Sequence, residues 1–101
     1  MINLTSENLN LLETKDKVIL VDYYAKWCVP CKTLIPRLEE LEKEYPEVIF
    51  VKVDVDANMS HAQELGIRSV PTVMVLKNGE SIHRSSGANT PEYYKEILNK
   101  A

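Results

Sequence analysis

The chain has 101 residues, 45% hydrophobic and 27% charged, which suits a globular protein with one domain over residues 1–101. A formal net charge of −3, with acidic and basic residues intermixed, argues against nucleic acid as a partner. No apolar run approaches the roughly 20 residues that span a bilayer, and the first residues do not form a signal peptide, so we expect a cytoplasmic protein with no membrane partner.

The first half of the chain predicts a strand, a helix, a second strand and a longer helix. Residues 2–4 suit a short strand, and Thr5 or Ser6 offers a side-chain oxygen to cap a helix with an apolar face of leucines. Residues 18–24 are β-branched, aromatic and almost continuously apolar, which is typical of a central strand buried on both faces. The helix that follows has an apolar stripe, and Pro36 inside it predicts a kink.

A further strand and a short helix are predicted next. Residues 48–53 form a second apolar run, which predicts another buried strand. Asn58 or Ser60 suits the start of a short helix, and Gly66 suits its C-terminal end, where a left-handed residue is common.

The last part of the chain predicts a hairpin and a terminal helix. Residues 72–76 suit a strong strand, and Asn78-Gly79 suits a type I′ turn into a weaker return strand over 81–85. Residues 90–92, Thr-Pro-Glu, predict the start of the last helix. The order βαβαββα indicates an α/β fold with a central mixed sheet and helices on both faces.

The chain contains two cysteines, Cys28 and Cys31, in the segment Cys28-Val29-Pro30-Cys31. A disulfide between them would close so short a loop that it would add only about 2 kcal/mol of stability before any strain. A secreted disulfide scaffold would carry more cysteines, spread along the chain. This spacing therefore favours a chemical role for the pair over a stapling role.

The position of the pair, between a strand and a helix, indicates what that chemistry is. Unpaired N–H groups at a helix N-terminus favour an anion, so Cys28 is predicted to be the nucleophilic thiolate in disulfide exchange. Cys31, about one turn later, lies on the same side and can resolve the mixed disulfide. A metal pair or inert thiols are the alternatives, but zinc needs about four ligands, and His61 and His83 fit no such spacing. Both histidines are expected at the surface.

Two charged residues interrupt the predicted strands. Asp22 lies in an otherwise apolar run, where burial would raise its pKa and make it a proton acceptor for Cys31; a solvated strand end is the alternative. Lys52 interrupts the strand over 48–53, and parallel pairing would bring it near Asp22. A lysine that reaches from the sheet into solvent is the alternative.

The sequence pattern alone does not decide the role of Trp27 or the isomer of the peptide bond before Pro71. Trp27, just before Cys28, is either a core anchor or an exposed docking residue. Pro71 precedes a strand, and an ordinary X–Pro bond is cis in only about 5–6% of cases, so spacing alone does not make it cis.

The chain resembles the thioredoxin family over almost its whole length. The motifs that carry the resemblance occur in the family's order and spacing, at residues 21–32, Pro36, 51–56, 66–72, 77–80 and 87–88. The resemblance implies a thioredoxin fold and a protein-disulfide reductase that holds no organic cofactor and no metal. It also implies protein disulfides as substrates, and electrons from NADPH through a flavin-containing thioredoxin reductase. We expect such a protein to be a monomer.

The resemblance also assigns roles to residues around the cysteines. It implies that Asp22 is the buried proton acceptor for the second cysteine and that Lys52 lies near it. It implies a cis bond before Pro71, which faces the cysteines. The residues that it places on the substrate-docking surface are Trp27, Val70, Pro71 and Gly87.

Two residues depart from the family pattern. Val29 stands where glycine is usual, and the resemblance implies that the two residues between the cysteines, Val29 and Pro30, tune the redox potential. Tyr24 stands where tryptophan is usual. Because of Val29, a second hypothesis is that the chain is an oxidase or isomerase-like member of the family. A third hypothesis is that it is a redox-independent scaffold subunit.

Overall fold

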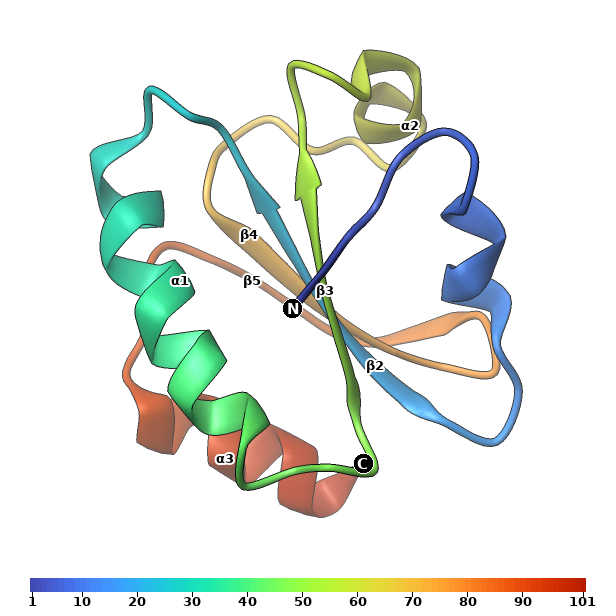
Figure 1. The fold of residues 1–101 in the computed structure, drawn as a ribbon, viewed down its shortest axis with the longest axis vertical. Coiled ribbons are helices and arrows are strands. Elements are labelled where there is room, and N and C mark those ends of the chain that lie inside the picture. The colour runs from blue at the N-terminus through green and yellow to red at the C-terminus, as the bar shows by residue number, and fades with distance from the viewer.

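The computed structural model describes residues 1–101 and contains one five-stranded sheet in the order β1-β3-β2-β4-β5 (Figure 1). The strands are β1 (Ile2–Asn3), β2 (Val18–Tyr24), β3 (Ile49–Asp54), β4 (Thr72–Lys77) and β5 (Glu80–Ser86). The helices are the 3₁₀ helix η1 (Leu9–Glu13) and the α-helices α1 (Val29–Glu42), α2 (Met59–Glu64) and α3 (Pro91–Lys100). No helix is long and apolar enough to cross a membrane.

The strand directions bring four segments together at one end of the sheet. β1, β3 and β2 are parallel, β4 is antiparallel to β2, and β5 is antiparallel to β4. The carboxyl ends of β2 and β3 therefore lie beside the start of β4 and the end of β5. This mixed sheet confirms the predicted fold class.

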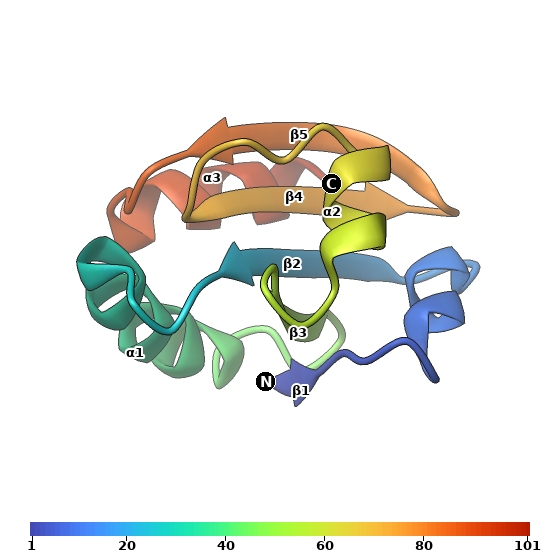
Figure 2. The same cartoon turned by 90° about the horizontal axis from the view of Figure 1, so that it is seen from above.

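Helices cover both faces of the sheet (Figure 2). α1 and α3 pack on one face, where their leucines and Tyr94 meet Leu20, Phe50, Val73 and Val75 of the strands. η1 and the segment that ends α2 pack on the other face against a second set of strand side chains. Successive residues of β2 alternate between the two cores, so β2 is buried on both sides, as its apolar sequence predicts.

The predicted order βαβαββα describes the chain from β2 to α3, and β1 and η1 precede it. The first helix differs from the prediction because neither Thr5 nor Ser6 caps it. The Asn8 side chain accepts a hydrogen bond from Thr5 N instead (2.6 Å), which holds residues 5–8 as a turn, and η1 starts at Leu9. This short 3₁₀ helix of five residues suffices to place Leu12 in the core.

Most other local signals hold. Asn78 and Gly79 both have positive φ angles, 54° and 79°, as a type I′ turn requires. Thr90 accepts a hydrogen bond from Tyr93 N, which caps α3 as predicted. Asn58 precedes α2 but caps it with no side-chain hydrogen bond; its amide donates to Asp54 O (3.0 Å) and ties the loop to β3.

Candidate active site

Cys28 and Cys31 form a disulfide at the N-terminus of α1. Cys28 is the N-cap residue, with extended backbone, and its Sγ accepts a hydrogen bond from Cys31 N (3.3 Å). Both cysteines are almost fully buried, with 3% and 1% of their surface exposed. The Cys31 N–H of the first helical turn is thus directed at Cys28 Sγ, and together with the helix dipole it favours negative charge on that sulfur after reduction.

The loop before β4 faces the cysteines. The Val70–Pro71 peptide bond is cis, the geometry that the resemblance implied. Val70 O lies 3.6 Å from Cys28 Sγ. Gly87 N donates a hydrogen bond to Pro71 O (2.9 Å), so the loop after β5 reaches the same place. The structure therefore brings Val70, Pro71 and Gly87 together at the cysteine end of the sheet.

Two apolar side chains beside the disulfide are open to solvent. Trp27 is 68% exposed and Val29 is 71% exposed, so Trp27 is not a core anchor. Its indole Nε1 donates to Asp56 Oδ2 (2.9 Å), which fixes the ring against the loop after β3. Sequence reasoning missed Asp56, although it follows a strand parallel to β2 and therefore ends at the same edge of the sheet.

Asp22 lies in the middle of β2 and is fully buried. Neither carboxyl oxygen has a hydrogen-bond partner. Burial raises the pKa of Asp22 to about 7, and the positive charge of Lys52 opposes this rise. Leu20 and Tyr24, which flank Asp22 on the same face of β2, contact the α1 core and the cysteine cluster respectively. Asp22 therefore lies beneath the start of α1, and the alternative of a solvated strand end is wrong.

Lys52 is the register partner of Asp22 on the neighbouring parallel strand. Its side chain is half-buried, and no ion pair joins it to the Asp22 carboxyl. Its Nζ lies over the ring of Tyr24, 5.8 Å from the ring centroid. The predicted proximity of Lys52 and Asp22 is present in the backbone register, but the ammonium group is held by an aromatic ring.

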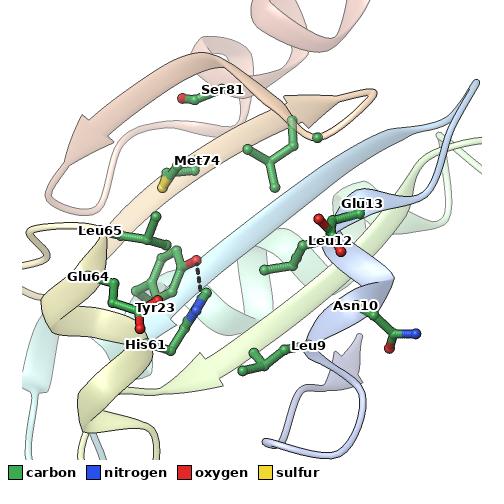
Figure 3. A pocket seen from close by; sticks show the side chains of 12 residues that line it. Leu9, Asn10, Leu12, Glu13, Tyr23, His61, Glu64, Leu65, Met74 and Ser81 are labelled. Carbon is green, nitrogen blue, oxygen red and sulfur yellow. Dashed lines mark hydrogen bonds between the residues drawn. The ribbon is translucent and has the colours of Figure 1, made fainter.

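The largest cavity lies elsewhere, between η1, α2 and the strands, with a volume of about 600 Å³ (Figure 3). No cysteine lines it. There the Tyr23 hydroxyl and His61 Nε2 share a hydrogen bond of 2.9 Å. His83 pairs in the same way with the Tyr93 hydroxyl (3.0 Å). Both histidines are half-buried partners of tyrosines rather than free surface residues, because each tyrosine hydroxyl needs a partner near the core.

No group of three or more His, Cys, Asp or Glu side chains is arranged to hold a metal ion. The site instead combines a dithiol–disulfide pair, a helix N-terminus that stabilises a thiolate and a buried carboxyl that titrates near neutral pH. Two exposed apolar side chains, Trp27 and Val29, lie beside this pair. These are the parts that exchange of a disulfide with a second protein needs.

Comparisons with known proteins match this chain to thioredoxins. The thioredoxin family model matches residues 1–100. Thioredoxin of Bacillus subtilis (strain 168) is 44% identical over 89 residues, which cover 87% of this chain and 86% of that protein. Thioredoxin of Chlamydia muridarum is 39% identical over 83 residues, covering 82% and 81%. The X-ray structure of Fasciola hepatica thioredoxin superposes with a TM-score of 0.89 at 39% identity, and all of both chains is covered.

Proposed function

Because this chain belongs to the thioredoxin family and is a thiol–disulfide oxidoreductase, we propose that Cys28 attacks protein disulfides and Cys31 resolves the product. The observation that carries these roles is the difference between the two sulfurs. Cys28 Sγ accepts a hydrogen bond from the first helical turn and lies 3.6 Å from Val70 O. Cys28 is flanked by the exposed Trp27 and Val29, whereas Cys31 lies within the first turn of α1. A substrate disulfide meets Cys28 first.

In the first step, the Cys28 thiolate attacks one sulfur of the substrate disulfide. The substrate S–S bond breaks, a Cys28–substrate mixed disulfide forms, and the other substrate sulfur leaves as a thiolate that takes a proton. The hydrogen bond that Cys31 N donates to Cys28 Sγ supports this step, because the same N–H can stabilise the attacking anion.

In the second step, the Cys31 thiol gives its proton to the Asp22 carboxylate and attacks Cys28 Sγ. The mixed disulfide breaks, the Cys28–Cys31 disulfide forms, and the second substrate thiolate leaves, so two electrons have passed to the substrate. A carboxyl with a pKa of about 7 suits this role, because it is half ionised near neutral pH and can both take and return the proton.

The disulfide must then be reduced again. We propose that a thioredoxin reductase supplies the two electrons from NADPH, and membership of the thioredoxin family supports this proposal. We also propose that the protein is a monomer and works in a reducing compartment such as the cytoplasm, where thiols are kept reduced and a dithiol can donate electrons. Size-exclusion chromatography with light scattering and cell fractionation test these two points.

Turnover of a disulfide-bonded protein with dithiothreitol as the electron source tests the attacking role. We expect catalysis by the natural chain and only the uncatalysed rate with Cys28→Ser, because a hydroxyl at this position forms no thiolate. Thr33→Ser, an exposed change on the same helix, is the control and should keep full activity. Catalysis by Cys28→Ser at the natural rate would end the proposal.

The exposed apolar pair Trp27 and Val29 is predicted to dock protein substrates. We expect Trp27→Ala to lower kcat/KM for a disulfide-bonded protein by roughly tenfold, since a central interface aromatic is worth about 1–2 kcal/mol. Val29→Ser should lower it by less. The rate with a small disulfide such as oxidised glutathione is the internal control: an equal loss with both substrates would show damage to the chemistry instead of to docking.

A further inference from the structure

Tyr24 connects the buried carboxyl to the lysine beside it. On β2, Tyr24 follows Asp22 by two residues, so both side chains lie on the same face of the sheet. On β3, Lys52 is opposite Asp22 and Asp54 is opposite Tyr24. Two carboxyls, one ammonium and one aromatic ring therefore occupy four adjoining positions of two parallel strands.

The ammonium group in this cluster makes no ion pair with either carboxyl. Lys52 Nζ lies 5.8 Å from the centroid of the Tyr24 ring, within the range of a cation–π contact. Asp54 is half-buried at the strand end, where a lysine can approach it and keep most of its hydration, whereas Asp22 is fully buried. Without the ring, the flexible lysine stem would be free to extend toward Asp54 and solvent.

We propose that Tyr24 is a positioning residue whose ring holds the Lys52 ammonium within electrostatic reach of Asp22 and away from Asp54. Asp22 then releases its proton more readily after each turnover. The inference rests on the proposed role of Asp22 as proton acceptor, and it adds a residue that adjusts the proton affinity of Asp22. Tyr24 itself takes no part in proton or electron transfer.

The other groups near Asp22 do not supply this effect. Tyr94 of α3 is close enough for the Asp22 charge to raise its pKa, and it carries no charge at neutral pH. The two cysteines of α1 are neutral in the disulfide state. Lys52 is the positive charge that lowers the pKa of Asp22. The position of its ammonium group therefore determines how far that pKa is lowered.

Carboxyl ¹³C NMR titration of Asp22 in the oxidised protein tests the proposal. We expect Tyr24→Leu to raise the proton affinity of Asp22 about threefold, because without the cation–π contact the Lys52 ammonium spends less time near Asp22. Tyr24→Phe and Tyr24→Trp keep a ring and should leave the proton affinity unchanged. In a Lys52→Met background, Tyr24→Leu should have no such effect, because no ammonium remains to be placed.

An unchanged or lowered proton affinity in Tyr24→Leu overturns the proposal, as does a rise that persists with Lys52→Met. If Tyr24→Leu does not fold, Tyr24→Met replaces it, and circular dichroism checks each variant. Single-turnover kinetics of Asp22→Asn test the proton-acceptor role separately: release of reduced substrate should slow more than the initial attack. If Asp22→Asn releases substrate at the natural rate but Tyr24→Leu raises the proton affinity of Asp22, only the acceptor role is disproved. If Asp22→Asn slows release but Tyr24→Leu leaves the proton affinity unchanged, only the positioning role of Tyr24 is disproved.

Discussion

We expect Cys31→Ser to accumulate as a covalent mixed disulfide between Cys28 and its protein substrates. Attack by Cys28 needs only the N-terminus of α1, which this change leaves intact. Release needs a second thiolate behind Cys28, and a serine hydroxyl does not supply it at neutral pH. The rate of release should therefore fall by several orders of magnitude while the rate of attack changes little. Non-reducing gels and mass spectrometry of the trapped species measure both.

The double variant Cys28→Ser, Cys31→Ser is the matched control and should trap nothing. Trapping through Cys31 in a Cys28→Ser variant, or free turnover by Cys31→Ser, would contradict the assigned order of the two cysteines. The double variant also tests a redox-independent scaffold role, because a scaffold would keep its biological activity without either thiol. The trapped partners, identified after reduction, would name the substrates of this chain.

Asp22→Asn is expected to stabilise the oxidised protein in a pH-dependent way. The pKa of Asp22 rises from 3.8 when the chain is unfolded to about 7 when it is folded, so ionisation opposes folding. The penalty is absent below pH 3.8, grows as the pH rises, and is complete above about pH 7. A difference of three pKa units corresponds to about 4 kcal/mol. Between acidic pH and pH 8, the unfolding free energy of the variant relative to that of the natural chain should therefore rise by about this amount.

Urea unfolding of both proteins at several pH values between 4 and 8 measures this gain as a difference in unfolding free energy. Val73→Ala is the control, because Val73 is the buried register partner of Asp22 on β4 and carries no ionisable group. Its effect on the unfolding free energy should be the same at every pH. If the difference in unfolding free energy between Asp22→Asn and the natural chain is also the same at every pH, Asp22 is not buried in its charged form.

The parts of the fold that depend on neighbours in sequence were predictable. Asn78-Gly79 specifies a turn with two positive φ angles, and Thr90 caps α3 through an N–H only three residues away. The strand–helix junction at Cys28 also follows from local signals. Where two local options compete, prediction failed: Asn8 accepts the Thr5 N–H and delays the first helix, which the residues alone do not reveal.

The parts of the site that depend on strand order were out of reach of the residues alone. Burial of Asp22 depends on the place of β2 between β3 and β4, beneath α1. The contact between Trp27 and Asp56 joins two loops that are far apart in sequence. The place of the Lys52 ammonium over Tyr24 depends on side-chain rotamers, which no periodicity encodes. The resemblance to a known family supplied the cis bond before Pro71, which spacing did not.

The hairpin between β4 and β5 has a practical use because of the strand directions. β4 begins next to the cysteines at Thr72 and ends at Lys77, so the turn at Asn78 and Gly79 lies at the far end of the sheet. A fluorophore or surface tether attached there would stay clear of the docking face. Immobilised in this orientation, every molecule would present its disulfide outward to proteins in a flowing cell extract.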